Sequence, residues 1–358
     1  MKNLSFPIFK TKSLPGAPLF DLNDPRERKK YFRFKAGTEI KKIQKYLENN
    51  TFLVLLLGKK GSGKGTYSKL FAEAVGGEKL VHLSVGDIVR AADEEVTDAN
   101  RRRQLIDYLK HNYRGYYSLE AILEAQENRG VSKPLLPSEY ILALIKREIE
   151  QVGRKAIFLD GFPRNLDQIS YSLFFRDLIG FRDDPDFLVL IDIPKSVIDA
   201  RIKTRVVCPL CQTPRNLKLF TTKRVGYDRK TKSFYLYCDS PGCKGVKMLA
   251  KEGDELGIEA IKDRLEADEQ LIKRAFSLYG VSKILLRNSI PVNQAKQMVD
   301  DYEITPEYFY QRDSKKKMVK TLKKPWIVKD DNGVPSYSLL APPVTIALIK
   351  QLADLLPT

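Results

Sequence analysis

The sequence is poor in cysteine, histidine and tryptophan, with four, two and one of these residues among its 358. Four cysteines are too few to form a disulfide scaffold for a chain of this length. The longest apolar run, residues 52–57, is much shorter than the roughly 20 residues that cross a membrane. Residues 1–20 contain no long apolar segment of the kind that forms a secretory signal. We therefore expect a cytoplasmic protein that neither spans a membrane nor depends on disulfides.

Negative charge is also scarce, because 45 acidic residues stand against 62 lysines and arginines, which gives a formal net charge of +17. The excess is concentrated in two segments. Residues 1–50 carry 12 basic and 5 acidic side chains, and residues 201–251 carry 13 basic and 2 acidic ones. Such an excess predicts an anionic partner, which composition alone leaves open among nucleic acid, a membrane surface and small phosphates.

Hydrophobic residues make up 43% of the chain, which is enough for a sizeable core. Short apolar runs recur along the chain and alternate with segments of helical periodicity. A short apolar run bounded by glycine or polar residues is typical of a strand buried on both faces of a parallel sheet. The alternation predicts an α/β fold with a doubly wound parallel sheet of five strands, at residues 52–57, 80–83, 156–159, 187–193 and 283–287.

Other segments depart from this alternation. Residues 88–150 are mostly helical in pattern, and residues 206–250 contain all four cysteines among several glycines and prolines, as an inserted small domain would. We expect irregular structure over residues 1–37 and a basic linker after residue 305, which includes residues 315–317, Lys320, Lys323 and Lys324. The sequence also predicts helices at residues 38–50, 256–279 and 343–356 and a hairpin at residues 326–340.

A glycine-rich segment directly follows the first predicted strand, and it reads Gly58-Lys59-Lys60-Gly61-Ser62-Gly63-Lys64-Gly65-Thr66. It fits the phosphate-loop pattern G-x-x-x-x-G-K-[ST] with one residue, Gly65, before the hydroxyl residue. Glycines let backbone N–H groups curl around phosphates, the N-terminus of the next helix adds positive potential, and Lys64 supplies a point charge. The predicted ATP-binding residues are Gly61, Ser62, Gly63, Lys64, Gly65 and Thr66.

The ending Gly63-Lys64-Gly65-Thr66 resembles that of nucleoside monophosphate kinases, and of the adenylate kinase family in particular. Two further segments resemble motifs of this family, and they read Ser84-Val85-Gly86-Asp87-Ile88-Val89-Arg90 and Asp160-Gly161-Phe162-Pro163-Arg164. The resemblance implies that Arg90 and Arg164 hold the acceptor phosphate, and that Asp87 and Asp160 act on magnesium through water. Val85 stands where adenylate kinases usually carry threonine.

Two residues close to the second motif bear on the acceptor base. Gln168 stands where adenylate kinases have a glutamine that pairs with adenine, which favours AMP. Asn165 instead resembles the pattern of uridylate and cytidylate kinases. The acceptor-binding residues that the resemblance implies are Ser84, Val85, Arg90, Leu136, Gly161, Phe162, Pro163, Arg164, Gln168 and Arg264.

Three further arginines resemble those of the family's lid. Arg201 and Arg205 match the pair at the lid hinge, and their i, i+4 spacing lets both reach one phosphate cluster from one helix face. The resemblance implies that both also bind ATP. Arg264 resembles the arginine that returns from the lid and bridges the two nucleotides. A second returning arginine is usual eleven residues earlier, where this chain has Gly253, with Lys251 the nearest basic residue.

The cysteines form the pattern C-x2-C followed by C-x4-C, with 26 residues between the two pairs. Close pairs on turns containing glycine and proline are typical of a tetrahedral four-thiolate zinc site. Two disulfides or free thiols are the alternatives. Many bacterial adenylate kinases carry a structural zinc at this place, which implies the zinc ligands Cys208, Cys211, Cys238 and Cys243.

The resemblance implies the reversible, magnesium-dependent reaction ATP + AMP ⇌ 2 ADP, with catalytic residues Lys64, Arg90, Arg164, Arg201, Arg205 and Arg264. The acceptor is already an anion, so positioning and charge neutralisation suffice without a general base. His82 and His111 fit no catalytic spacing, and we expect them in the strand core and on the surface. Three alternatives stay open: a kinase for CMP, UMP or GMP, an ATP-dependent nucleic-acid-binding protein with a zinc ribbon, and an inactive kinase fold.

The predicted domains are a basic N-terminal arm and helix at residues 1–50, a P-loop core at 51–87, 151–205 and 252–303, a helical acceptor-binding subdomain at 88–150, a zinc-binding lid at 206–251 and a C-terminal extension at 304–358. We expect a monomer that binds ATP and AMP and has no membrane partner. The basic N-terminal arm is the place where nucleic acid or another anionic partner would bind.

Overall fold

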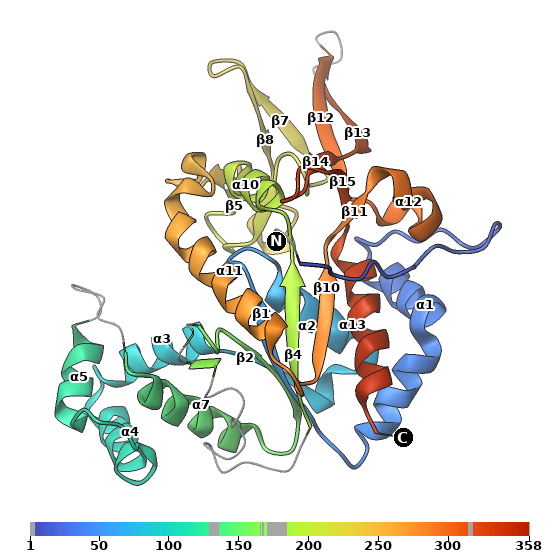
Figure 1. Cartoon of the computed structure of the whole chain (residues 1–358). Coiled ribbons are helices and arrows are strands. Elements are labelled where there is room, and N and C mark those ends of the chain that lie inside the picture. Colours follow the sequence, from blue (N-terminus) through green and yellow to red (C-terminus); the bar gives the residue numbers. More distant parts are fainter. Residues whose placement is uncertain are drawn as a thin grey trace.

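A computed structural model describes residues 4–128, 136–164, 166, 168–169, 185–313 and 318–357 (Figure 1). Asn165 and residues 315–317, which entered the sequence argument, lie outside the described residues. Among the helices described, none combines the length and the apolar character needed to cross a membrane.

Five parallel strands form the central sheet, in the order β10-β4-β1-β3-β2. This confirms the predicted doubly wound α/β fold and all five predicted strands. The central strand, β1, is almost wholly buried, as expected for a strand covered on both faces. The strands are β1 (Leu53–Gly58), β2 (Leu80–Ser84), β3 (Ala156–Asp160), β4 (Asp186–Asp192) and β10 (Lys283–Arg287).

Helices cover both faces of the sheet. One face carries α2 (Lys64–Val75), α1 (Pro25–Tyr46) and α13 (Ala341–Leu355), which pack side by side in Figure 1 and share one hydrophobic core. The other face carries α3 (Val85–Glu95), α7 (Ser138–Val152) and α11 (Lys262–Ser277). The chain between α3 and α7 adds α4 (Ala99–Asn112) and α5 (Leu119–Glu127), which extend to one side of the molecule.

The cysteine-bearing segment forms small sheets of its own beyond the short helix α10 (Lys195–Lys203). Its core consists of a few buried residues, three of which are Cys208, Cys238 and Cys243. So small a core supplies little hydrophobic stabilisation, which is the usual reason for a metal or a disulfide in such a unit. The strands are β5 (Arg205–Val207), β6 (Pro214–Asn216), β7 (Val225–Asp228), β8 (Ser233–Leu236) and β9 (Leu249–Ala250).

The first helix begins much earlier than predicted, at Pro25, so the expectation of irregular structure is wrong for residues 25–37. Asp24 caps the helix by accepting a hydrogen bond from the backbone N–H of Arg26 at 2.7 Å, and proline is favoured at the first helical position. Ala36 interrupts the helical geometry with φ −148° and ψ 34°. That kink explains why Thr38 looked like a helix start in the sequence.

The predicted basic linker is also wrong, because Lys320, Lys323 and Lys324 lie on a strand. β12 (Pro306–Asp313) and β13 (Met318–Pro325) pair along eight residues each as an antiparallel hairpin. The hairpin predicted at residues 326–340 is confirmed by β14 (Ile327–Lys329) and β15 (Pro335–Ser338), which pair with each other, and β15 also pairs with β11 (Ser289–Pro291). The short helix α12 (Val292–Met298) follows β11, and the helix expected at residues 256–279 spans only the range of α11, after two short 3₁₀ turns.

Candidate active site

The phosphate loop joins β1 to α2 at the carboxyl edge of the sheet. Gly61 and Gly63 have φ angles of +84° and +94°, a conformation that glycine adopts without steric cost. Gly63 precedes the first turn of α2, and Lys64 is the first residue of that helix. Lys64 Nζ donates to the carbonyl of Gly58 at 2.9 Å, so its ammonium folds back over the loop. The free N–H groups of a helix start and a nearby cation together suit a bound phosphate.

A cavity of 410 Å³ opens beside this loop. Lys64 Nζ lies 3.6 Å from a carboxylate oxygen of Asp160, and Arg264 Nε lies 3.0 Å from a carboxylate oxygen of Asp268. Arg164 and Lys60 supply two further cations to the lining. Four cations beside a helix N-terminus can neutralise several phosphate groups at once. The predicted site residues that the cavity brings together are Gly61, Lys64, Asp160, Gly161, Pro163, Arg164 and Arg264.

Asp268 is a site residue that the sequence analysis missed. It is only 3% exposed, and one carboxylate oxygen accepts from the backbone N–H of Lys60 at 2.8 Å while the other meets Arg264. This carboxylate therefore holds the phosphate loop and the returning arginine in fixed relation. The i, i+4 spacing of Arg264 and Asp268 on one helix is a signal that could have found it.

Lys59, the second residue of the loop, is fully buried and is held by the C-terminal extension. Its ammonium donates to the carbonyl of Ile193 at 3.0 Å and to Asp331 at 2.6 Å. The other carboxylate oxygen of Asp331 accepts from the backbone N–H of Lys195 at 2.8 Å. Burial raises the pKa of Asp331, but the charge and hydrogen bond of Lys59 outweigh this effect and lower it to about 2. The two residues stand 272 positions apart, so no local pattern could have predicted the pair.

The acceptor-side motif runs from the end of β2 into α3. Ser84 caps α3 by accepting from the backbone N–H of Asp87 at 3.4 Å. Val85 is buried, and its side chain lies 3.4 Å from the position of a Cβ on Gly161, so the two predicted acceptor motifs touch. Arg90 and Asp87 pair with each other at the exposed surface of α3. The structure therefore does not bring these two side chains into the phosphate cavity.

Gln168 is 3% exposed, and its amide braces the neighbouring backbone. Its oxygen accepts from the N–H of Arg164 at 2.7 Å, and its nitrogen donates to the hydroxyl of Ser138 at 3.0 Å. Phe162 is fully buried, while Leu136 is half-buried against the same hydrophobic core. The amide of Gln168 thus positions the segment that carries Arg164.

Arg201 lies on α10, whereas Arg205 is the first residue of β5, so the two arginines do not share one helix face as the sequence predicted. Arg201 donates to the carbonyl of Gly61 at 3.3 Å and so contacts the phosphate loop. Arg205 forms a bidentate pair with Asp254, with N···O distances of 2.7 and 2.6 Å, and this hydrogen bonding raises its pKa. Asp254 directly follows Gly253, the position at which the family's second returning arginine is missing. Arg205 is therefore held by a carboxylate away from the cavity.

The four cysteine sulfurs lie within 4.8 Å of one another. Cys208 Sγ is 3.7 Å from Cys243 Sγ, and Cys211 Sγ is 3.7 Å from Cys238 Sγ. Zinc–sulfur bonds of about 2.3 Å at tetrahedral angles place sulfurs roughly 3.8 Å apart, whereas a disulfide needs about 2 Å. All four thiols are free, so the spacing fits a metal cluster and not two disulfides. Hydroxyl groups of Thr213 and Ser240 lower the pKa of the Cys211 thiol to about 5, whereas the neighbouring Cys211 thiol and burial raise the pKa of Cys243 to about 12. The protein alone therefore favours the thiolate at Cys211 and not at Cys243.

The hairpin of β12 and β13, called the C-terminal hairpin below, docks on the cysteine-bearing segment. Tyr310 donates its hydroxyl to the carbonyl of Leu217 at 2.6 Å, and the backbone N–H of Tyr308 donates to the carbonyl of Lys218 at 2.8 Å. Trp326 follows the hairpin and is 4% exposed, in a cluster with Ile193, Val197, Ile198, Leu219 and Leu265. The extension therefore contacts both the cysteine-bearing segment and the short helix α10.

The two histidines lie apart from the cavity. His82 belongs to β2 as expected but is only half-buried, with Nδ1 2.9 Å from the hydroxyl of Ser68, and burial lowers its pKa. His111 is exposed on α4, which confirms the surface prediction. Ser62 is fully buried behind the loop, whereas Thr66 is exposed in the first turn of α2.

A family model described as "AAA domain" matches residues 57–206. The adenylate kinase of Clostridium acetobutylicum is 30% identical over 214 residues, which are 60% of this chain and 80% of that protein. The adenylate kinase of Petrotoga mobilis is 27% identical over 256 residues, or 72% of this chain and 95% of that protein. The mitochondrial GTP:AMP phosphotransferase of Drosophila melanogaster is 29% identical over 228 residues, or 64% and 83%. Together with the phosphate loop and its cavity, these similarities show that the chain belongs to the adenylate kinase family and is a nucleoside monophosphate kinase.

Proposed function

We propose that the protein catalyses the reversible transfer ATP + AMP ⇌ 2 ADP. The observation that carries the proposal is the cavity at the phosphate loop, where Lys64, Arg164 and Arg264 converge beside Asp160. Two of the relatives described above are adenylate kinases, and the name of the third gives AMP as its acceptor and GTP as its donor.

The proposed reaction needs little covalent assistance from the protein. The acceptor oxygen of AMP is already anionic, so no side chain has to remove a proton. Backbone N–H groups of the loop and Lys64 would hold the donor phosphates, Arg164 would hold the acceptor phosphate, and Arg264 would bridge the two. Rate acceleration then comes from alignment and from neutralising charge in a site that excludes water.

We further propose that residues 206–251 act as a lid and residues 88–150 as the acceptor-binding part, around a core of residues 51–87, 151–205 and 252–303. Arg90 and Arg205 now pair with carboxylates of Asp87 and Asp254. When nucleotides bind and the lid closes, phosphates would replace these carboxylates as partners. Such an exchange keeps each guanidinium paired in both states, which lowers the cost of moving it.

Magnesium and zinc complete the proposal. Magnesium would neutralise charge between the ATP oxygens, and the carboxylates of Asp160 and Asp87 would bind it through water. Asp160 suits this role because its half-buried carboxylate ends a strand beside Lys64. Zinc would bind the four cysteine thiolates, whose sulfur spacing fits it, and would supply folding energy to a segment with very little core.

The test is a coupled assay with the purified, full-length protein. We expect kcat/KM with ATP to be at least tenfold higher for AMP than for GMP, CMP or UMP. Lys64→Ala should remove the transfer and leave the urea unfolding curve unchanged. Equal or better use of CMP, or transfer that survives in Lys64→Ala, would contradict the proposal.

A second candidate is a kinase with another acceptor base. It is favoured by Gln168, whose amide already bonds the backbone of Arg164 and the hydroxyl of Ser138. The acceptor series above decides it, and repeating the series with GTP as the donor identifies the donor base.

Zinc is measured on the same sample: we expect one zinc per chain, and much less in Cys238→Ser. We further propose that the protein is a cytoplasmic monomer. Cell fractionation tests its location, and mass determination in solution tests its oligomeric state.

A further inference from the structure

Helix α1 carries the whole charge excess of the N-terminal segment. Between Pro25 and Tyr46 it has nine basic and two acidic side chains, so it accounts for the entire +7 of residues 1–50. Three of the nine cations have partners among the described residues: Arg28 pairs with Glu73, Lys30 with Glu27, and Lys35 with Asp300. No described residue forms an ion pair with the other six, which are Arg26, Lys29, Arg33, Lys41, Lys42 and Lys45.

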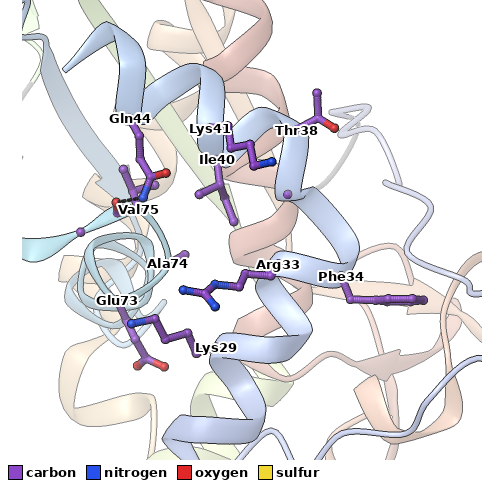
Figure 2. Close-up of a pocket in the computed structure, with 12 residues that line it drawn as sticks. Lys29, Arg33, Phe34, Thr38, Ile40, Lys41, Gln44, Glu73, Ala74 and Val75 are labelled. Carbon is purple, nitrogen blue, oxygen red and sulfur yellow. Dashed lines mark hydrogen bonds between the residues drawn. The ribbon is translucent and has the colours of Figure 1, made fainter. Parts of the chain in front are cut away.

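A groove of 710 Å³ lies between α1 and the end of α2 (Figure 2). Lys29 and Arg33 extend from α1 toward α2, whereas Phe34 points away to the far side of α1. Lys41 lies two turns beyond Arg33 along the same helix. At 1.5 Å per residue, Lys29 and Lys41 would be about 18 Å apart along a straight helix, and the kink at Ala36 makes this an upper bound. These cations follow the length of the groove and do not converge on one point.

Contacts at both ends hold the groove open. At one end Arg28 pairs with Glu73 at 2.7 Å, and at the other Gln44 donates its amide to the carbonyl of Val75 at 2.7 Å. Between them the helix bends at Ala36, and a Cβ on Gly37 would meet nothing within 4 Å. The groove is therefore a built feature of the α1–α2 packing.

The charge within the groove is unopposed. Glu73 is the sole acidic residue in its described lining, and Arg28 already neutralises it. Lys29, Arg33 and Lys41 are exposed and thus bring three positive charges with no counter-charge. In water such a row attracts a polyanion whose charges are also spaced along a line.

We propose that this groove binds the phosphate backbone of a nucleic-acid strand. A mononucleotide would place its phosphates in one cluster, which a row up to about 18 Å long does not match. A lipid surface is flat, whereas the cations here line a concave groove. No aromatic ring of the described lining faces the groove, so the contacts are to phosphates and the binding is independent of base sequence. This inference does not depend on the proposed phosphoryl transfer.

The experiment measures binding of a fluorescein-labelled 12-nucleotide oligouridylate by anisotropy, with the full-length zinc-loaded protein and saturating ADP in the transfer site. Three phosphate contacts predict a slope of log K against log salt of about −2 for a single strand. The variant Lys29→Glu/Arg33→Glu/Lys41→Glu should weaken binding by at least tenfold. Parallel titrations use a duplex of the labelled strand with its complement, and vesicles containing 30% phosphatidylserine. They show whether the groove prefers a single strand, a duplex or a lipid surface.

A matched control separates the groove from general charge. The variant Arg229→Glu/Lys230→Glu/Lys320→Glu makes the same change in net charge. Its exposed positions lie in the turn between β7 and β8 and on β13. We expect this control to keep at least half of the binding constant, and both variants to keep the phosphoryl transfer rate. Equal loss in the two variants, a flat salt dependence, or binding to the vesicles without binding to either oligonucleotide would overturn the proposal. Tighter binding to the duplex than to the strand would overturn its single-stranded form.

Discussion

The two extensions of the chain both pack against the kinase core, yet they use their polar side chains differently. The C-terminal extension directs Asp331 into the phosphate loop, Tyr310 onto the cysteine-bearing segment and Trp326 against helix α10. Helix α1 of the N-terminal extension buries Tyr31 and Phe32 on its inner face and leaves six cations exposed or half-exposed on the outside.

The two extensions are thus attached to the enzyme in different ways. The C-terminal extension supplies the buried partner of Lys59, and so it is tied to the phosphate loop itself. Helix α1 is fixed by its inner face, where Lys35 binds Asp300 and Tyr31 donates to the buried Glu303 at 2.6 Å. Its outer charges are not needed for that attachment, which leaves them available for a partner.

The largest effect is expected at the link between the C-terminal extension and the loop. Asp331→Ala leaves the fully buried ammonium of Lys59 without its counter-charge. Breaking a buried pair from one side costs about 3–5 kcal/mol, so urea unfolding should show a loss of that size. Because Lys59 is part of the phosphate loop, we also expect KM for the donor nucleotide to rise.

The double variant Lys59→Met/Asp331→Leu is the control for that experiment. Replacing both members of a buried pair with apolar side chains is often neutral for stability. We expect the double variant to recover most of the lost free energy of unfolding. If Asp331→Ala alone is as stable as the wild type, the extension is not part of the loop and the comparison fails.

Acid should weaken the inner attachments of both extensions alike. Burial raises the pKa of Asp300, but Lys35 outweighs this and lowers it to about 2, the same value as for Asp331. A folded-state pKa below the usual 3.8 means that each carboxylate stabilises the fold above about pH 4, and this stabilisation is lost as the pH falls toward 2. Each should contribute about 2 kcal/mol.

Unfolding curves at pH 5, 4, 3 and 2 test this expectation. Between pH 4 and pH 2 the free energy of unfolding should fall less in Asp300→Asn and in Asp331→Asn than in the wild type. The difference in each variant should be about the 2 kcal/mol that its carboxylate contributes. An unchanged decline in either variant would show that its carboxylate is not held as the structure indicates. The test sharpens the comparison, since the extensions should differ on their outer faces and not in these anchors.

A smaller effect is expected where the C-terminal hairpin meets the cysteine-bearing segment. Tyr310→Phe removes the hydroxyl that donates to Leu217, and it leaves the ring against Phe234, with centroids 5.5 Å apart. The loss of such a bond costs about 1 kcal/mol, so the melting temperature should fall by roughly 2 °C. The control Tyr279→Phe changes a fully exposed tyrosine and should have no effect. Equal melting temperatures for the wild type and both variants would show that the hairpin only lies near the cysteine-bearing segment.

Local sequence signals predicted the sheet and the phosphate loop well. Five apolar runs marked the five strands, and the glycines around Lys64 marked the turn whose φ angles only glycine adopts easily. The four cysteines were recognisable for the same reason, because turn residues separate each close pair. These features depend on neighbours in the sequence, so the sequence alone displays them.

The missed features depend on residues that are distant in the sequence. Lys59 and Asp331 are 272 positions apart, and neither carries a mark of burial in the chain. The β12–β13 hairpin looked like a basic linker because its lysines face solvent, and only its docking on the cysteine-bearing segment explains its order. The start of α1 was missed because the kink at Ala36 hid a helix that Asp24 and Pro25 begin.

The smallest effect is expected in the α1 groove, and its direction is the sharpest part of the comparison. Lys29 and Arg33 are four residues apart, as are Lys41 and Lys45, and like charges at this spacing destabilise a helix by about 0.2–0.5 kcal/mol. Arg33→Gln and Lys41→Gln should therefore leave the free energy of unfolding unchanged or raise it by a few tenths of a kcal/mol, with phosphoryl transfer unaltered. Urea unfolding at 20 mM and 500 mM salt tests the cause, because salt should abolish any gain that comes from relieved repulsion. A loss of more than 1 kcal/mol of unfolding free energy in either variant would mean that these cations stabilise the fold. An unchanged or higher free energy of unfolding would support binding of an anionic partner as their role.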